Sequence, residues 1–405
     1  MNNDFYRIKR LPPYVFAEVN RMKAEQRARG ADIIDLGMGN PDTAPPTHVI
    51  DKLAEVARDP KAHRYSASKG IEGLRKAQAR YYKRRFNVDL DHNSEVVVTL
   101  GSKEGLANLA QAITAPGDVI LSPNPSYPIH AFGFIIAGAT VRSIPTSPGP
   151  DFFQKLDLQM RYTVPKPTVL VIGYPSNPTA ETVGLDFYHD VVSFARHHNL
   201  WVISDLAYAE IYFDGNPPPS ILEVPGAKDV AIEFTSLSKT FSMAGWRIGF
   251  GVGNTELVGA LTRVKSYLDY GAFTPIQVAA AAALDGPEDE IEKRRQMYKR
   301  RRDVCVESFG RAGWDLPVPN ASMYIWAPVP AHFAHLGALG FAKALIEEAH
   351  VAVSPGVGFG EQGENHVRIA FVENEQRIRQ AGRQIRAFFQ REGVNVPAAQ
   401  EPAES

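Results

Sequence analysis

Short apolar runs alternate with longer segments of helical periodicity through the middle of the chain. The apolar runs occupy residues 96–100, 119–121, 169–172, 201–204, 231–235 and 248–252. They are apolar at nearly every position, which is typical of strands buried on both faces of a sheet. Helical periodicity lies between them, for example over 185–198 and 256–268. This alternation predicts an α/β fold whose large domain has a mostly parallel sheet flanked by helices.

The pattern changes after about residue 285. The elements expected there are a long charged helix over 288–312, strands over 323–327 and 366–371, and helices over 340–350 and 375–391. They indicate a smaller α+β domain. We therefore expect an N-terminal segment that packs with the small domain (1–45), the large domain (46–285), the small domain (286–393) and a disordered tail rich in Pro, Ala and Glu (394–405).

Composition narrows the class of protein. The 405 residues are 44% hydrophobic and 22% charged, with a net charge of -1, so neither nucleic acid nor an anionic membrane is favoured as a partner. Apolar runs such as 132–137 are far too short to span a bilayer, and the N-terminus does not resemble a signal peptide. Cys305 is the single cysteine and has no partner for a disulfide. We expect a cytoplasmic protein.

Lys239 is the most informative residue in the sequence. It follows a buried-looking strand in the segment 235–250 and is surrounded by small and hydroxyl-bearing residues. A desolvated lysine loses its proton more easily and becomes a nucleophile towards an aldehyde. Ser236, Ser238 and Arg247 would then suit a phosphate group. The alternative is a lysine at a strand end that simply reaches solvent.

Pyridoxal phosphate (PLP) is a cofactor that needs such a lysine, which carries its aldehyde as a Schiff base, together with a partner for the pyridine nitrogen. Asp205 ends the strand 201–204, and its carboxylate would raise the pKa of the pyridinium. Tyr208 would hydrogen-bond the phenolic oxygen of the ring. The alternatives are an aspartate that caps a turn and a tyrosine that only packs.

Further candidates follow other strands. Ser102 and Lys103 open a helix after the strand 96–100, where backbone N–H groups form an anion site. Tyr127 would stack on the pyridine ring, and Asn177 would bond its phenolic oxygen. Taken alone, these residues also fit a helix N-cap, packing in a Pro-rich turn and an Asx turn.

Arg368 lies in an otherwise apolar, strand-like run over 366–370. Its planar fork matches a carboxylate, so it is the candidate for the α-carboxylate of a substrate. A solvent-facing position on an alternating strand is the alternative.

Several short motifs occur together in one order. They are Gly-Asn-Pro (39–41), Gly-Ser-Lys (101–103), Asn-Pro-x-Tyr (124–127), Ser-Asn-Pro (176–178), Asp-x-x-Tyr (205–208), Ser-x-Ser-Lys (236–239), Trp-Arg-x-Gly (246–249) and Arg368. This set resembles the fold-type I, class I and II PLP-dependent aminotransferases. The resemblance implies the roles given above, and adds Gly39 and Asn177 to Arg368 at the substrate carboxylate. It also implies that Tyr65 reaches the phosphate of a neighbouring subunit, in a homodimer with shared active sites.

Longer segments are similar to bacterial glutamate–pyruvate (alanine) aminotransferases, which are relatives of LL-diaminopimelate aminotransferases. These segments are 10–16, 37–42, 205–208, 265–275 and 354–360. On that analogy Tyr14 contributes to the substrate pocket. The chain has no recognisable second arginine for a side-chain carboxylate, and Tyr127 stands where aspartate aminotransferases have a tryptophan, so aspartate is not the expected substrate.

The resemblance implies a ping-pong transamination in which L-alanine and 2-oxoglutarate give pyruvate and L-glutamate. Lys239 would act as the general base. An LL-diaminopimelate or other amino-acid aminotransferase is the alternative, followed by a PLP β-lyase or decarboxylase. A PLP-binding transcription regulator is a further alternative, but the motifs begin near Gly37 and leave no room for a DNA-binding domain before them.

Three other patterns carry no function in this interpretation. Residues 358–363 match Gly-x-Gly-x-x-Gly, but a strand and not a helix is expected after them, so they are interpreted as a loop. The basic run 293–302 is expected to be the solvated face of a helix. His197 and His198 are adjacent and would point apart on a helix, so no metal site is expected.

Overall fold

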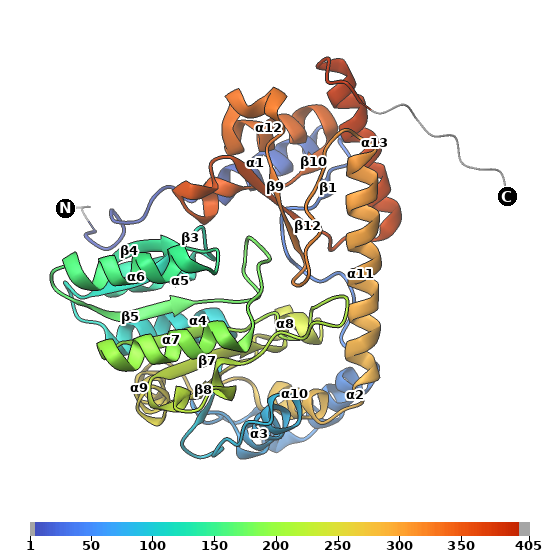
Figure 1. Ribbon diagram of the computed structural model, residues 1–405. Coiled ribbons are helices and arrows are strands. Elements are labelled where there is room, and N and C mark those ends of the chain that lie inside the picture. The colour runs from blue at the N-terminus through green and yellow to red at the C-terminus, as the bar shows by residue number, and fades with distance from the viewer. Residues whose placement is uncertain (1–4, 397–405) are drawn as a thin grey trace. The chain divides into compact units, whose positions relative to one another are not determined.

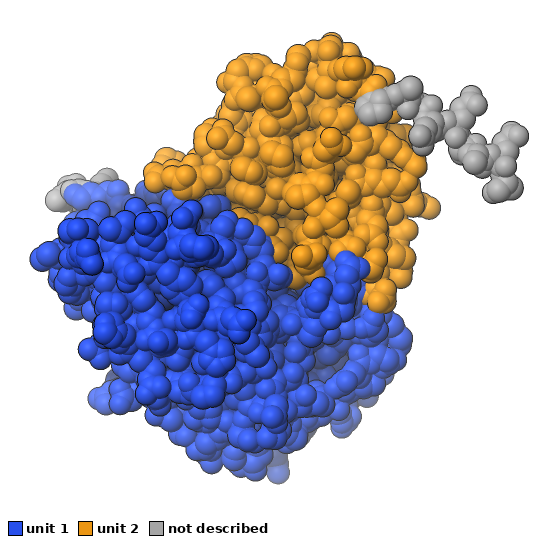
Figure 2. All heavy atoms as spheres, viewed as in Figure 1, with its two compact units in different colours: residues 1–12, 43–177, 181–295 blue, residues 13–42, 178–180, 296–405 orange. Residues whose placement is uncertain are grey.

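A computed structural model describes residues 5–396 of the chain, which separates into two compact units (Figure 2). Unit 1 comprises residues 1–12, 43–177 and 181–295, and unit 2 comprises residues 13–42, 178–180 and 296–405. The division between residues 295 and 296 falls inside the long helix α11 (Asp289–Gly310). Most of the tail expected to be disordered, residues 397–405, lies outside the described residues.

Unit 1 is built on a seven-stranded sheet. Its strands are β2 (Val96–Thr99), β3 (Val119–Asn124), β4 (Thr140–Pro145), β5 (Pro167–Ile172), β6 (Trp201–Asp205), β7 (Ala231–Ser236) and β8 (Gly249–Gly253). Their order in the sheet is β2-β8-β7-β6-β5-β3-β4. Strand β8 is antiparallel to both of its neighbours, and all other pairs are parallel. The predicted α/β fold with a mostly parallel sheet is confirmed.

Helices cover both faces of this sheet (Figure 1). One core contains side chains of α3 (Glu72–Phe86), α6 (Pro150–Tyr162) and α7 (Leu185–His198), and the other contains side chains of α4 (Ser102–Ile113), α5 (Ile129–Ala137) and α9 (Thr255–Leu268). Val96 and Val98 pack in the first core, whereas Val97 packs in the second. Because successive side chains of a strand point to opposite faces, two apolar layers require an uninterrupted apolar strand.

The remaining helices of unit 1 are α2 (Thr47–Val56), the single-turn α8 (Leu237–Thr240) and α10 (Thr274–Leu284). Helices α2 and α10 pack on one another, and α10 also contacts α3. Val49, Leu74, Ala279 and Leu284 belong to the same core as α7, so this helical layer extends the first core beyond the sheet.

Unit 2 is the smaller α+β unit. Its elements are α1 (Val15–Ala28), β1 (Ile34–Asp35), β9 (Tyr324–Pro328), α12 (Gly337–Ala349), β10 (Val351–Ala352), β11 (Ser354–Pro355), β12 (His366–Ala370), α13 (Glu375–Arg391) and the last part of α11. Strands β11, β12 and β9 form an antiparallel sheet, and β1 pairs in parallel with β10. The glycine-rich run before β12 forms the 3-10 turns Gly356–Phe359 and Glu361–Gly363, as expected of a loop.

The basic run on α11 is neutralised by neighbouring carboxylates. Lys293 lies 2.8 Å from Asp289, and Arg301, which is buried, forms a two-pronged ion pair with Asp42 at 2.7 and 2.8 Å. The expectation of a fully solvated face is therefore wrong for Arg301 and Arg302, both of which are buried. Neither α11 nor any other helix among residues 5–396 is long and apolar enough to cross a membrane.

Candidate functional site

Three candidate residues of unit 1 follow the carboxyl ends of neighbouring parallel strands. Asn177 comes after β5, Asp205 is the last residue of β6, and Lys239 comes three residues after β7. Strand register aligns Ile172 with Ser204 and Asp205 with Phe234, so the three strands end at the same edge of the sheet. Ligands of open α/β sheets bind at this edge.

Asp205 is held between a histidine and a backbone amide. Its Oδ2 atom lies 2.9 Å from Nε2 of His130, and its Oδ1 atom accepts a hydrogen bond of 3.2 Å from the N–H of Ala207. The side chains of His130 and Asp205 are only 5% and 11% exposed. Two partners therefore fix the orientation of a largely buried carboxylate at the strand end. Such a carboxylate suits a cationic ligand group, because little water is present to screen its charge.

Tyr208 lies in the tight turn that follows Asp205. The N–H of Leu206 bonds to the carbonyl of Phe234 at 2.8 Å, and the N–H of Ile211 bonds to the carbonyl of Tyr208 at 3.1 Å. Tyr208 is 6% exposed. The turn is thus attached to β7, the strand that leads to Lys239, and its tyrosine is fixed by burial.

Glycines bring an arginine against the first turn of α4. Gly101 has φ +84°, and a Cβ at this position would lie 2.1 Å from Nη2 of Arg247. A Cβ on Gly249 would lie 2.6 Å from the backbone nitrogen of Ser102. The guanidinium donates to the carbonyls of Ala244 at 2.8 Å and Leu100 at 3.2 Å. A helix N-terminus beside a guanidinium is an anion site, and only glycine permits this close approach.

Two hydroxyl side chains lie at the end of β7. Ser236 caps α8, since its Oγ accepts a hydrogen bond of 3.1 Å from the N–H of Ser238, and the two hydroxyl oxygens are 2.9 Å apart. Register aligns Ser236 with Gly249 and Gly249 with Thr99, so the ends of β7, β8 and β2 lie together. The structure thereby brings Ser102, Ser236, Ser238 and Arg247 to one edge, beside the half-buried Lys239.

Lys103 and Tyr127 approach each other next to these groups. The Nζ atom of Lys103 lies 5.9 Å from the centre of the Tyr127 ring. The same ring meets the imidazole of His130 edge to face, with 5.9 Å between the ring centres. Tyr127 is therefore linked to Asp205 through a single intervening side chain, which is consistent with a ring that lines a site containing that carboxylate.

Unit 2 contains the other predicted residues, Gly39, Arg368 and Tyr14. Arg368 is 6% exposed and donates through Nη2 to the carbonyl of Gly37 at 2.8 Å. Its guanidinium carbon lies over the rings of Tyr324 and Phe359, 4.0 and 4.5 Å from their centres. Attraction between the cation and the faces of the two rings lowers the cost of burying the charge of Arg368. The expectation of an inward-facing arginine is met.

Gly39 and Tyr14 both belong to the surroundings of these rings. A Cβ on Gly39 would lie 2.0 Å from the hydroxyl of Tyr324. Tyr14 is 65% exposed and contacts Phe16 edge to face, and Phe16 in turn contacts Phe359. Tyr14 is thus connected through two rings to the aromatic side chains that hold Arg368.

Comparison with known proteins identifies the family. The family model for aminotransferase class I and II matches residues 31–385. The chain belongs to the class I and II aminotransferases.

Several relatives of this aminotransferase are similar over nearly their full length. AatC of Rhizobium meliloti (strain 1021) is 64% identical over 95% of both chains. The glutamate-pyruvate aminotransferase AlaC of Escherichia coli (strain K12) is 54% identical over 98% of this chain and 96% of its own. The LL-diaminopimelate aminotransferase of Moorella thermoacetica is 42% identical over 94% and 97%. The predicted resemblance to these two groups of aminotransferases is confirmed.

Among solved structures, substrate-bound BacF from Bacillus subtilis superposes with a TM-score of 0.89 at 33% identity. The match covers 99% of this chain and 100% of BacF. The likeness therefore extends over both units of the chain.

Enzymes of this family use PLP, and the residues of unit 1 fit that group. A phosphate needs several donors close together, and Gly101 and Gly249 allow Arg247 and the backbone at the start of α4 to approach closely enough to provide them. A pyridine nitrogen that must stay protonated needs a fixed buried carboxylate, which Asp205 provides. The donor set and the spacing of the strand ends agree with the chemistry of the cofactor.

Sequence reasoning did not select His130, Tyr324 or Phe359. His130 lies three residues after Tyr127 at the start of α5, and this helical spacing was the only available sign that both face the same way. Tyr324 and Phe359 reach Arg368 through the pairing of β9 with β12 and through the turn Gly356–Phe359. These are tertiary contacts that no local pattern predicts.

Proposed function

We propose that this aminotransferase transfers the amino group of L-alanine to 2-oxoglutarate, giving pyruvate and L-glutamate, with PLP attached to Lys239. The observation that carries the cofactor assignment is the arrangement at one sheet edge of a fixed buried carboxylate, a lysine and an anion site with glycines at its base. The substrate assignment is supported by the likeness to the E. coli glutamate-pyruvate aminotransferase over 98% of this chain.

Each cofactor-binding group would have a separate task. Ser102, Lys103, Ser236, Ser238 and Arg247 would bind the phosphate. Asp205, oriented by His130, would keep the pyridine nitrogen protonated, because a carboxylate at close range favours the cationic form of its partner. Tyr208 and Asn177 would donate hydrogen bonds to the phenolic oxygen, and Tyr127 would cover one face of the ring.

PLP supplies an aldehyde that accepts the amino group and a ring that stabilises negative charge at the substrate Cα. The chain supplies the proton transfers. Lys239 would act as the base that removes the proton from the substrate Cα through Nζ. Lys239 lies on α8, three residues after the end of β7, and is half-buried, so its amine is held near the carboxyl edge of the sheet.

Arg368, with Gly39 and Asn177, would bind the α-carboxylate of both substrates. The guanidinium of Arg368 is held by the carbonyl of Gly37 and by the two aromatic rings. Its side chain therefore loses little conformational entropy when a carboxylate binds. Tyr14, which is exposed, would contribute to the wall around the substrate side chain.

LL-diaminopimelate is the second candidate substrate, because the relative from Moorella thermoacetica that is 42% identical carries that name. Product analysis with L-alanine, L-glutamate and LL-diaminopimelate as donors would separate the two. The alanine assignment predicts pyruvate formation that depends on 2-oxoglutarate, without release of ammonia or carbon dioxide. Turnover of LL-diaminopimelate alone would replace alanine as the substrate and retain the transaminase.

Absorption spectroscopy tests the cofactor assignment. We expect purified protein to show a visible Schiff-base band that L-alanine and L-glutamate each convert to the shorter-wavelength band of the aminated cofactor. Lys239→Ala should abolish turnover while leaving the circular dichroism spectrum unchanged. Full activity of that variant, or the absence of any band after addition of PLP, would contradict the assignment.

We further propose a homodimer in which Tyr65 reaches the phosphate site of the neighbouring subunit. Tyr65 is 85% exposed and contacts Tyr270, itself 63% exposed, at 4.7 Å between ring centres. Tyr267 is 84% exposed and Phe273 is 43% exposed, so large aromatic side chains are concentrated in this part of unit 1. Exposed apolar groups of this kind typically mark association sites.

Subunit mixing tests the shared site. Lys239→Ala and Tyr65→Ala should each have little activity alone. A hybrid dimer would contain one site with both native residues, so co-refolded mixtures should regain part of the wild-type rate. Failure to regain activity in dimers verified by light scattering would argue against a contribution of Tyr65 to the neighbouring site.

A further inference from the structure

The turn that carries Tyr208 ends in a buried carboxylate. Glu210, two residues after Tyr208, is 4% exposed, and the residues on either side of it, Ala209 and Ile211, are equally buried. Loops usually run on the surface, because buried backbone groups need partners. The partners of this turn therefore come from elements distant in sequence.

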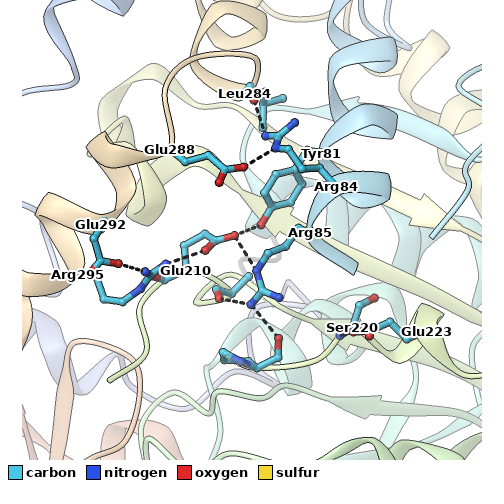
Figure 3. A network of polar contacts seen from close by, with 12 residues as sticks. Tyr81, Arg84, Arg85, Glu210, Ser220, Glu223, Leu284, Glu288, Glu292 and Arg295 are labelled. Carbon is cyan, nitrogen blue, oxygen red and sulfur yellow. Dashed lines mark hydrogen bonds and ion pairs between the residues drawn. The ribbon is translucent and has the colours of Figure 1, made fainter. Parts of the chain in front are cut away.

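Side chains from α3 and α11 converge on Glu210 (Figure 3). Tyr81 donates to its Oε1 atom at 2.6 Å, and Nε of Arg85 lies 3.2 Å from the same oxygen. Nη2 of Arg295 lies 3.2 Å from Oε2. Burial and the nearby carboxylate raise the pKa of Tyr81 well above its ordinary value, so its hydroxyl keeps its proton and acts as a donor.

The same two arginines also bind the backbone of the turn. Arg85 donates to the carbonyl of Ala209 at 3.4 Å, and Nε of Arg295 donates to the carbonyl of Glu210 at 3.2 Å. Arg295 also lies over the ring of Tyr212, 3.9 Å from its centre. Arg85 and Arg295 thus hold the carboxylate of Glu210 together with the carbonyls of Ala209 and Glu210. This restricts the position of the backbone immediately after Tyr208.

We infer that Glu210, with Tyr81, Arg85 and Arg295, is a positioning group that sets the orientation of the Tyr208 hydroxyl towards the phenolic oxygen of PLP. This inference rests on the proposed function. Glu210 does not itself touch the cofactor. It acts through the backbone of the turn 206–210. The start of this turn is fixed by the hydrogen bond from the N–H of Leu206 to the carbonyl of Phe234. Tyr208 therefore lies between two fixed points.

The effect on the cofactor has a defined sign. A hydroxyl that donates to the phenolic oxygen stabilises its negative charge and makes that oxygen less basic. When the turn loosens, this donation weakens. The pH midpoint at which the visible band of the bound cofactor changes then rises, by up to about one unit, because the hydrogen bond to the charged oxygen is weakened and not removed. Retention of PLP falls about tenfold for the same reason.

Two substitutions and two matched controls test the inference on the holoenzyme. Glu210→Gln removes the charge between the arginines, and Tyr81→Phe removes one hydroxyl while preserving the ring. Glu292→Gln is the control for the first, because Glu292 pairs with the same Arg295 but is half exposed. Tyr82→Phe is the control for the second, because its hydroxyl bonds Glu233 at 2.8 Å and not Glu210.

The measurements are the pH titration of the visible band, PLP release under dialysis, and thermal unfolding. We expect Glu210→Gln and Tyr81→Phe to raise the spectral midpoint and weaken PLP retention, and both controls to leave the midpoint at the wild-type value. Lower melting temperatures with an unchanged midpoint in both test variants would overturn the inference and leave the proposed function standing. A wild-type protein without a visible band after addition of PLP would overturn both.

Discussion

Glu233 should make the stability of this protein fall as pH rises towards neutrality. It lies on β7 in the interior of unit 1 and is fully buried. Its carboxylate accepts hydrogen bonds from Tyr82 at 2.8 Å, Ser220 at 2.5 Å, Ser204 at 3.0 Å and the N–H of Ile221 at 3.2 Å. These donors lower the pKa of Glu233, but burial outweighs them and raises it from 4.5 to about 7.

The size of the effect follows from the shift. Below pH 4.5 both folded and unfolded chains hold the proton, so the contribution of Glu233 to stability is fully present. Between pH 4.5 and pH 7 the side chain of Glu233 is deprotonated in the unfolded chain but keeps its proton in the folded chain. The free energy of unfolding therefore falls as the pH rises through this range. A shift of about 2.5 units at about 1.4 kcal/mol per unit corresponds to about 3.4 kcal/mol, of which about 2.5 kcal/mol is lost between pH 5 and pH 8.

Urea unfolding of the apoprotein at equal concentrations from pH 5 to pH 8 measures this loss. We expect Glu233→Gln to flatten the pH dependence, so that its stability relative to the wild type rises by about 2–3 kcal/mol across the range. Glu72→Gln is the control: Glu72 is exposed, and the adjacent Lys76 lowers its pKa, so its effect has the opposite sign and is screened by solvent. A constant difference between wild type and Glu233→Gln at every pH would refute the reasoning.

Three further predictions concern single residues. Gly101→Ala should destabilise the protein by about 1–3 kcal/mol, because φ +84° with ψ 156° is a glycine conformation, and should weaken PLP retention by displacing Arg247; thermal unfolding and cofactor fluorescence measure both. Arg368→Lys should raise KM for the amino acid about 10- to 100-fold with a smaller change in kcat, since a lysine cannot form the two-pronged pair; equal losses in both constants would count against a binding role. The Cys305 thiol should react with Ellman's reagent only as fast as the protein unfolds, because burial raises its pKa; rapid reaction in the native state would contradict this.

The strands of the central sheet were predictable where both faces are buried. Residues 96–98 are apolar in succession because alternate side chains enter different cores, and such a run has no helical period. Strand β4 was not predicted. It lies at the edge of the sheet, and its residues Thr140, Arg142 and Ser143 are exposed, so the apolar pattern is missing.

The position of a candidate residue in the fold was predictable where a chemically informative side chain stands at or just after the end of a predicted strand. Lys239 and Asp205 stand at the ends of apolar runs, where a charged residue calls for an explanation. The aromatic rings around Arg368 and the partner of Asp205 were not predictable, because His130 and Tyr324 approach through helix packing and strand register. The partners of Glu210 are even more remote, since Arg85 precedes it by more than a hundred residues and Arg295 follows it on another helix.

The reversed direction of β8 has a consequence for the order in which the site assembles during folding. Because β8 is antiparallel to β7, the segment between them starts and ends at the same edge of the sheet, and it contains both Lys239 and Arg247. Pairing β7 with β8 closes a short loop, whereas bringing α4 or Asp205 to the same place closes loops of tens to more than a hundred residues, at greater entropic cost. Contacts of low sequence separation form fastest. The lysine and the arginine can therefore come together as a local hairpin-like unit, and the other candidate residues of the site join it as the long-range contacts form.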